Sequence, residues 1–459
     1  MNRKQNLEVF AKTPVRKAVL LQIVPAVASQ MVTLVYNLAD TYFVGMLNAP
    51  HETAAVTVAY PSFLMLTAIS NLFGVGGASA IARALGRQDE EGARRIAAVS
   101  LAGGLLSALL FSAAFRLLAD PVLNLWGATE ATYATAYGYA KWVVILGGPF
   151  TILNTLLANL VRAEGSAGAA AFGVSFGGVL NILLDPLFVL PQFLGLGAVG
   201  AGMATALSNG AAVACFAVYL VRRRGATYLN LLPANLRYAA QYLRPILAIG
   251  FPSALQYALT VVATAAQADF VSQYPTEAVA ALGIVKKLDQ LPLYFSIGVS
   301  NGLLPLLAYN HAAGNHHRRA QAFRIGSLMS FGFAVLCLVC YEAFATPLVS
   351  LFIADAATVR YGAVFLRCMV TAMPMMALCY PMIIQFQAMG RARESLVCSI
   401  LRKGVLDIPL LYLMDALFPL YGCMWVQPIV DAISLAAALW FYRAIQRGSA
   451  AGGMAPAGA

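Results

Sequence analysis

Twelve long apolar stretches constrain this chain more than any other feature of its sequence. Each can cross the ~30 Å hydrocarbon core of a bilayer, which needs ~20 helical residues. The stretches are 18–44, 54–82, 96–119, 136–161, 167–193, 196–221, 246–272, 279–309, 321–345, 359–387, 396–414 and 421–442. They are too long and too uniformly apolar for the alternating ~10-residue strands of a β-barrel. The sequence therefore predicts an all-α polytopic membrane protein with twelve transmembrane helices.

The composition and the charge pattern favour the same class. The chain is 60% hydrophobic and only 11% charged, whereas soluble proteins carry roughly 25% charged residues. Lys and Arg concentrate in the N-terminal arm and in alternate loops, which by the positive-inside rule places both termini in the cytoplasm. We therefore expect a multi-pass protein of the bacterial cytoplasmic (inner) membrane. The net charge of +11 reflects this topology, so no binding to nucleic acid is expected.

The sequence carries no pattern typical of an enzyme or of a resident metal. The seven Cys lie in or beside apolar stretches, where this residue type behaves as a small packing residue. A Gly-rich phosphate loop followed by Lys-Ser/Thr is missing, so direct drive by ATP is not expected. We expect no enzymatic activity, no cofactor, and no metal beyond Na⁺ as a candidate coupling ion.

The two halves of the chain resemble each other. The matching pairs are Pro25 with Pro252 at an offset of 227, Pro149 with Pro374 at 225, and both Gly200 with Gly422 and Asp185 with Asp407 at 222. Their order and nearly constant offset indicate an internal repeat of six spans. Because six is even, both halves enter the membrane from the same side, and such parallel repeats are related by an axis along the membrane normal.

This repeat predicts the domain organisation. We expect an N-terminal six-helix lobe at 1–221, a cytoplasmic inter-lobe linker at 222–245, a C-terminal six-helix lobe at 246–447 and a disordered Gly/Ala-rich tail at 448–459. Transporters built from such repeats bind substrate at the interface between the two halves.

Asp40 is the most informative single residue, because it stands alone in the first apolar stretch. A carboxylate in hydrocarbon is costly, so intramembrane acids usually face a cavity and act on protons, ions or cationic ligands. Asn37 and Tyr36 precede it by three and four residues, so all three can share one helix face. The second half has Gln267 where the first has Asp40, which concentrates ion coupling in the N-terminal lobe. The alternative is a structural, hydrogen-bonded acid.

Asp185 is a second isolated acid, in the fifth stretch. Asn181 lies four residues before it on the same helix face. Pro186 follows and removes a backbone donor, so a freed carbonyl can join these side chains in holding a small cation. The alternative is an Asn–Asp pair that hydrogen-bonds helices together.

Several other polar residues of the spans are weaker candidates for the cavity. Tyr139, Asn154 and Thr205 are placed to reach the Asp40 and Asp185 cluster, with inter-helix hydrogen bonding as the alternative. In the second half the candidates are Lys287, with its neighbours Lys286 and Asp289, and the more isolated Asp431. Arg402 and Lys403 precede Asp407 by five and four residues, which favours a structural ion pair there.

At these residues the sequence resembles the multidrug and toxic compound extrusion (MATE) family, over nearly the whole chain and on the DinF-like and MepA-like side of it. The residues that carry the resemblance are Tyr36-Asn37-x-x-Asp40-x-x-Phe43-Val44-Gly45, Gly165, Asn181-x-x-x-Asp185-Pro186, Gln290-Leu291-Pro292 and Pro305-Leu306-Leu307-Ala308-Tyr309-Asn310. The resemblance implies two six-helix bundles around a V-shaped cavity. It also implies export of cationic or amphipathic compounds in exchange for H⁺ or Na⁺, with the acids matching Asp40 and Asp185 in ion coupling.

We therefore expect a secondary-active multidrug efflux antiporter that acts as a monomer on small amphipathic molecules. The alternative is a lipid-linked oligosaccharide flippase, whose anionic cargo would need a basic cavity. Lys141, Lys286, Lys287 and Arg367 are the residues that keep this alternative open. A membrane scaffold without transport activity would leave Asp40 unexplained.

Overall fold

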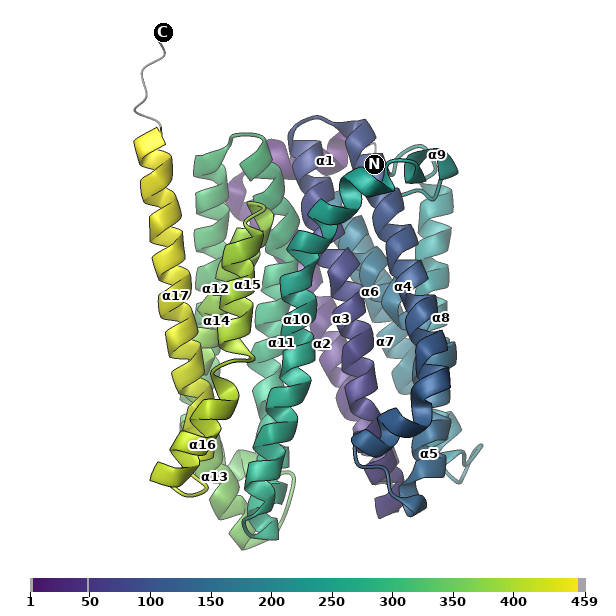
Figure 1. Ribbon diagram of the computed structural model, residues 1–459, viewed down its shortest axis with the longest axis vertical. Helices are drawn as coiled ribbons and strands as arrows, with labels where there is room; N and C mark the ends of the chain where they lie inside the picture. Colours follow the sequence, from purple (N-terminus) through teal and green to yellow (C-terminus); the bar gives the residue numbers. More distant parts are fainter. Residues whose placement is uncertain (1–2, 48, 453–459) are drawn as a thin grey trace.

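A computed structural model describes residues 3–47 and 49–452 as a bundle of long helices (Figure 1). The first half contains α1 (Arg3–Ala11), α2 (Val15–Gly45), α3 (Pro50–Gly86), α4 (Glu90–Leu125), α5 (Glu130–Ala140), the π-helical η1 (Lys141–Leu146), α6 (Gly148–Ala163), α7 (Ala167–Val189) and α8 (Gly197–Arg222). The second contains α10 (Ala239–Ser272), α11 (Thr276–Ala312), α12 (His316–Ser350), α13 (Ala356–Val370), α14 (Met373–Ala388), α15 (Ala392–Arg402), α16 (Asp407–Leu417) and α17 (Gly422–Gly452). The short α9 (Pro233–Leu236) lies between them.

The helices follow the apolar stretches of the sequence. Within the described residues nine helices are long and apolar enough to span a membrane, and two bent helix pairs raise this number to 11. The remaining expected span, 396–414, is broken into α15 and α16. The predicted all-α, two-bundle membrane fold is confirmed, and an unbroken eleventh span is wrong.

Two prolines explain the bent pairs. The α5–η1 segment meets α6 at 48°, and α13 meets α14 at 43°. Pro149 and Pro374 lie in the first turn of α6 and α14, where a proline is tolerated but the regular helix before it is interrupted. The Gly147 amide donates to the Trp142 carbonyl at 2.8 Å, a π-helical step. The repeat-related prolines therefore produce the same bend in both halves.

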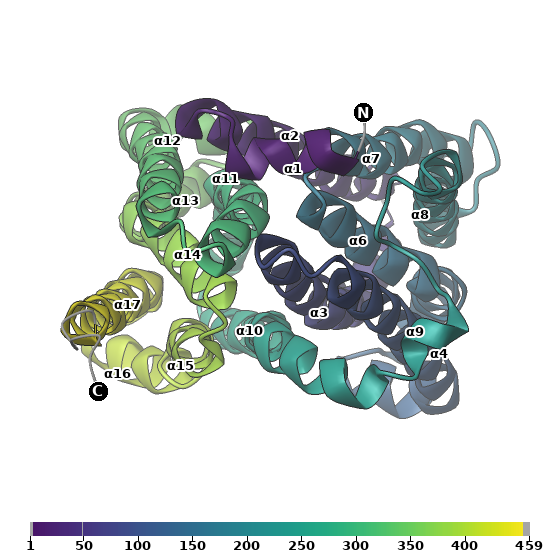
Figure 2. The same ribbon diagram turned by 90° about the horizontal axis from the view of Figure 1, so that it is seen from above.

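The two halves form two lobes that lie side by side (Figure 2). Helix α1, the linker with α9, and the late part of α17 lie at one end of the bundle, called the linker end below (Figure 1). The connection between α8 and α10 is shorter than expected, 223–238, because α10 begins at Ala239. Residues 448–452, expected in a disordered tail, belong to α17, and 453–459 lie outside the described residues.

The linker is fastened to the N-terminal lobe. The Glu164 carboxylate, at the end of α6, accepts hydrogen bonds from the Thr227 hydroxyl at 2.8 and 2.9 Å and from the Leu229 amide at 3.0 Å. The Tyr228 amide donates to the same carboxylate at 2.5 Å. Glu164 is only 4% exposed, so these donors replace the water it would otherwise need.

Glycines bring the lobes together in the half of the bundle nearest the linker end. A Cβ atom added at Gly76 of α3 would lie 2.1 Å from the Ile246 carbonyl oxygen of α10, and one at Gly250 of α10 would lie 1.7 Å from the Leu72 carbonyl oxygen of α3. Helix α11 approaches α2 in the same way at Gly302, where an added Cβ would lie 2.7 Å from the Gln22 carbonyl oxygen. Only residues without a side chain permit this approach.

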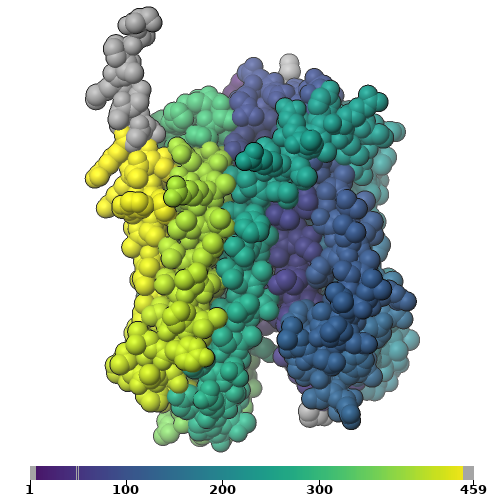
Figure 3. Space-filling model, viewed as in Figure 1, coloured from purple at the N-terminus to yellow at the C-terminus, as the bar shows by residue number. Residues whose placement is uncertain are grey.

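The buried apolar core is shared by the two lobes near the linker end and separate in each lobe elsewhere. The largest apolar cluster includes residues of both lobes near the linker end, such as Ile23, Val75, Ile246 and Leu303. Two further clusters lie entirely within one lobe each, around Leu123 in the first and Phe365 in the second. Figure 3 shows the lobes parted at the end opposite the linker. The lobes are thus joined at the linker end and separate at the other.

Candidate functional site

A cavity of about 1070 Å³ lies between the two lobes. Its wall extends from Leu125 and Ser272, near the parted end, to Asn71 and Arg162, deeper in the bundle. Of the predicted site residues, Tyr36, Asn37, Asn154, Asn181 and Asp431 line it.

The two predicted coupling acids are not among the residues that line this cavity, although Tyr36 and Asn181, one helical turn before them, do line it. Asp185 is 0% exposed, and its Oδ1 accepts a hydrogen bond from the Asn181 amide at 3.3 Å. Asp40 lies close enough to Asp185 for the two carboxylates to repel each other when both are ionised. Asp185 Oδ2 and Asp40 Oδ1 are buried without a hydrogen-bond partner among the described residues. These oxygens can therefore accept a proton or a cation, which would also relieve the repulsion.

Tyr36 and Tyr139 complete the surroundings of the two acids. Both phenols lie within electrostatic range of Asp40 and of Asp185. Tyr36 also lines the cavity, whereas Tyr139 is 6% exposed and packs inside the lobe. Tyr36 and Asn181 are thus cavity-lining residues that also neighbour the acids.

Other polar residues of the N-terminal lobe make structural contacts. The Asn181 amide also donates to the Thr205 hydroxyl at 3.4 Å, and the Asn154 amide donates to the Asn209 side-chain oxygen at 2.8 Å. The Asn37 amide donates to the Tyr294 hydroxyl of α11 at 3.1 Å, so it joins the two lobes.

Four further predicted residues do not line the cavity, although two of them, Tyr139 and Thr205, do reach the Asp40 and Asp185 group. Tyr139 and Thr205 are buried within the N-terminal lobe, away from the cavity surface. Gln267 is 8% exposed and its amide donates to the Cys423 carbonyl oxygen at 3.1 Å. Lys287 is partly exposed, but the cavity is lined by its neighbour Lys286 instead.

The residues that kept the flippase alternative open are also dispersed. Lys286 lines the cavity, whereas Lys141 is exposed, and Arg367 lies 3.9 Å from Glu342 near the surface.

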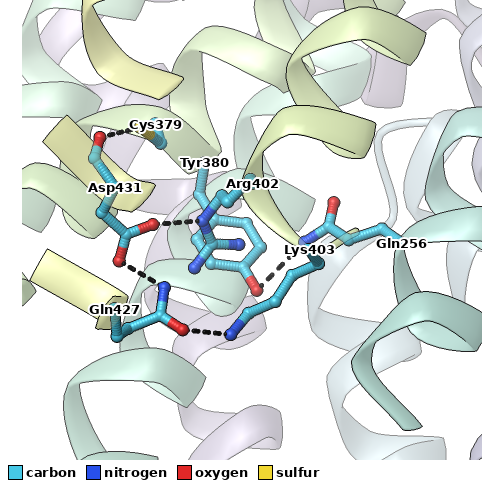
Figure 4. Close-up of polar contacts among 7 residues, drawn as sticks. All are labelled: Gln256, Cys379, Tyr380, Arg402, Lys403, Gln427 and Asp431. Carbon is cyan, nitrogen blue, oxygen red and sulfur yellow. Dashed lines mark hydrogen bonds and ion pairs between the residues drawn. The ribbon is translucent and has the colours of Figure 1, made fainter. Parts of the chain in front are cut away.

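The C-terminal lobe presents a charged network to the same cavity (Figure 4). Arg402 Nε donates to Asp431 Oδ1 at 2.9 Å, and both residues are almost completely buried. The Gln427 amide donates to Asp431 Oδ2 at 2.9 Å, and Lys403 Nζ donates to Gln427 Oε1 at 2.5 Å. The Arg402 guanidinium carbon lies 4.2 Å from the centre of the Tyr380 ring.

This network corrects two predictions. Asp431 is not isolated, and the partner of Arg402 is Asp431 rather than Asp407. The expected pairing assumed one continuous helix, but Lys403 adopts φ −142° and ψ 51° and ends α15. Asp407 therefore begins a separate helix, α16, where its Oδ2 is buried without a hydrogen-bond partner in the described chain.

Comparison with known proteins gives the family. The MatE family model matches residues 25–187 and 252–413, which together make up more than half of the chain. The chain belongs to the MATE family. It is 30% identical to the multidrug export protein MepA of Staphylococcus aureus over 95% of each chain, and 28% identical to MepA of Staphylococcus saprophyticus over 95% of each chain.

The fold of this MATE protein agrees with solved structures. A MATE crystallised in complex with MaL6 superposes with a TM-score of 0.89 at 25% identity, covering 96% of this chain and 99% of the other. The chain is thus a multi-pass membrane transport protein of the MATE family rather than an enzyme.

The two MatE matches begin at Pro25 and Pro252, the pair that defines the offset of 227. At the offset of 222, three residues of the N-terminal site have counterparts in the C-terminal network. Asn181 corresponds to Lys403, Asp185 to Asp407 and Thr205 to Gln427. The Asn181–Thr205 hydrogen bond is repeated as the Lys403–Gln427 hydrogen bond. Where the N-terminal lobe has a neutral amide beside its acid, the C-terminal lobe has a built-in cation.

Sequence reasoning missed Lys403 and Gln427 as cavity residues and gave Arg402 the wrong partner. The signal was present, because the offset of 222 places Lys403 on Asn181 and Gln427 on Thr205. Applying the repeat to every candidate residue, and not only to the acids, would have pointed to both positions.

Proposed function

We propose that this MATE protein is a secondary-active multidrug exporter that exchanges amphipathic, including cationic, compounds for protons. Asp40 and Asp185 are the coupling carboxylates, and Asn181 orients Asp185. The observation that supports this proposal is the pair of neighbouring carboxylates, each with a buried, unpartnered oxygen, one helical turn from residues that line an inter-lobe cavity. The named multidrug export relatives support the substrate class.

The proposed mechanism follows from the repulsion between Asp40 and Asp185. A proton on the pair removes one charge, so protonation favours an arrangement in which the acids are close together and shielded. A compound in the cavity favours the arrangement that holds it. Coupling arises because the two ligands favour different states of the same lobes. The cavity contains wall residues from both lobes, so a bound compound senses their separation.

Protons are proposed over sodium because burial in an apolar region favours a neutral carboxyl group. Sodium is the alternative, since the unpartnered oxygens of Asp40, Asp185 and Asn181 are the kind of ligand that it takes. A lipid-linked oligosaccharide flippase has less support, because the named relatives are multidrug export proteins and the C-terminal cavity wall carries three acids beside its basic residues.

The test uses purified protein in sodium-free proteoliposomes with a fluorescent amphipathic cation inside or outside. An imposed proton gradient alone is expected to drive transport of the dye against its own gradient. If transport stays absent until sodium is added, the coupling ion is sodium rather than the proton, and the assignment of the two carboxylates is unaffected. No transport under either gradient would contradict the antiport mechanism.

Asp40→Asn tests the assigned carboxylate, because asparagine keeps size and hydrogen bonding while removing the charge. Ion-driven transport should be lost at wild-type expression and thermal stability. Asp269→Asn is the matched control, since Asp269 is an acid of the cavity wall in the other lobe. Full ion-driven transport by Asp40→Asn would refute the role of Asp40.

A further inference from the structure

The charged groups on the two sides of the cavity differ in kind. In the N-terminal lobe the acids Asp40 and Asp185 do not line the cavity, and the wall is formed by neutral polar and apolar residues together with Arg162. In the C-terminal lobe the wall contains three basic residues, Lys286, Arg402 and Lys403. The same wall also contains the acids Asp269, Asp289 and Asp431, so the availability of the basic groups depends on how these acids are used.

Arg402 has donor capacity that the protein does not use. Its side chain is 1% exposed, and it contacts Asp431 through Nε. Its Nη1 is buried with no hydrogen-bond partner in the part of the chain that the structure describes, although Arg402 lines the cavity. Leaving such a donor unsatisfied is unfavourable, more so for a charged group. A ligand oxygen in the cavity would satisfy it.

The two lysines are also incompletely neutralised. Lys403 donates to the neutral side chain of Gln427. Lys286 has no hydrogen bond or ion pair with any described residue. Lys286 and Lys403 lie near enough to repel each other.

None of the acids on this wall forms an ion pair with Lys286 or Lys403 within the described residues, and Asp269 makes no ion pair with a described basic residue. Asp431 uses both of its oxygens on Arg402 and Gln427. Asp289 shares the cavity wall and acts electrostatically on Lys286, but it makes no ion pair within 4.0 Å of a described basic residue. Asp407 lies behind the wall and is 5% exposed.

We propose that Lys286, Arg402 and Lys403 form an anion subsite that binds a carboxylate group of the transported compound. The proposal rests on the proposed function, because it assumes that the cavity holds the exported molecule. The ligand class is an amphipathic aromatic compound that carries a carboxylate. Tyr257, Tyr294, Tyr380 and Met376 line the same cavity and provide an aromatic and polarizable surface for the rest of the ligand.

The pseudo-symmetry of the lobes explains why the anion subsite lies in the C-terminal lobe. Lys403 takes the place of Asn181, so the acid Asp407 already has a cation beside it, whereas Asp185 has no basic side chain beside it among the described residues. One lobe is thereby specialised for a coupling cation and the other for an anionic group of the substrate.

The test measures binding of a matched dye pair to the full-length protein in lipid nanodiscs, without an ion gradient. The pair is a rhodamine with a free carboxylate and its methyl ester, which share the aromatic body and differ at the carboxylate alone. Wild-type protein should bind the free carboxylate at least tenfold more tightly than the ester, relative to the partitioning of each dye into empty nanodiscs. One charge-assisted hydrogen bond corresponds to about this factor.

Lys286→Gln is the informative variant, because the change removes no hydrogen bond or ion pair to any residue that the structure describes. It should weaken binding of the free carboxylate by about tenfold and leave binding of the ester within twofold. Lys287→Gln is the matched control, since Lys287 neighbours it on α11 but lies off the cavity wall. Lys403→Gln should reproduce the effect of Lys286→Gln.

Equal wild-type affinity for both dyes, or an equal loss of both dyes in Lys286→Gln, would overturn the anion subsite. The proposed antiport is tested by a different result from the one that tests the anion subsite. Ion-driven transport of a cationic dye without any carboxylate preference would refute the subsite alone. A carboxylate preference without ion-driven transport would refute the antiport alone.

Discussion

Replacing Gly250 by alanine is expected to separate the lobes at the linker end. Gly250 of α10 faces the Leu72 carbonyl oxygen of α3, and an added Cβ would lie 1.7 Å from that oxygen. The contact would have to widen to at least 3.0 Å, below which real Cβ atoms are essentially never found. The obstacle is backbone, so no side chain can rotate away, and the two helices themselves must move apart.

The magnitude follows from the cost of overpacking. An added methylene in a well-packed site typically costs about 1–3 kcal/mol. This cost applies only to the arrangement in which α3 and α10 touch. It therefore shifts the ratio of the two lobe arrangements by about 5-fold to 150-fold toward the one that is open at the linker end. The same reasoning applies from the other side to Gly76, whose Cβ would lie 2.1 Å from the Ile246 carbonyl oxygen.

Hydrogen–deuterium exchange of the protein in nanodiscs measures this shift. Backbone amides near Gly76 and Gly250 should exchange faster in Gly250→Ala than in the wild type, because water enters between the lobes at the linker end. Amides near Ser272, at the parted end of the cavity, should exchange more slowly as that end closes. Gly283→Ala is the control, because an added Cβ at Gly283 would have nothing within 4 Å.

The reasoning would be refuted if Gly250→Ala and Gly283→Ala showed the same exchange and the same thermal stability. Faster exchange everywhere in Gly250→Ala would indicate general unfolding instead. The expected signature is opposite in sign at the two ends of the cavity.

Three further predictions use other contacts. Asp185→Asn should abolish ion-driven dye transport while Gln267→Ala leaves most of it, since Gln267 only hydrogen-bonds a buried carbonyl; equal losses in a proteoliposome assay would contradict the N-terminal coupling site. Asp431→Leu should destabilise the protein by about 3–5 kcal/mol, because it leaves the buried Arg402 charge unpaired. The double replacement of Asp431 by Leu and Arg402 by Met should recover most of the lost thermal stability. Glu164→Ala should make the linker sensitive to protease while the bundle stays folded, because three linker groups lose a hydrogen bond to its carboxylate. An unchanged cleavage rate would argue against this anchoring.

The sequence by itself determined the membrane class, nearly all of the spans and the repeat. The length of an apolar stretch and its helical periodicity are local properties of the sequence, so they can be recognised without knowledge of the packing. The repeat is also readable, because the same bend needs the same proline at Pro149 and Pro374. The isolation of Asp40 and Asp185 in apolar stretches was likewise visible, and the structure places the two acids together.

Only the tertiary structure decided which polar residues face the cavity and which partners they take. Helical spacing assigned Arg402 and Lys403 to Asp407, but the backbone leaves the helical conformation at Lys403, and Asp431 of α17 reaches Arg402 instead. Tyr139 and Gln267 have the polarity of cavity residues, yet the packing of neighbouring helices buries them. The polarity of a residue follows from the sequence alone. Which side of a helix faces the cavity depends on how two lobes that are distant in the sequence pack against each other.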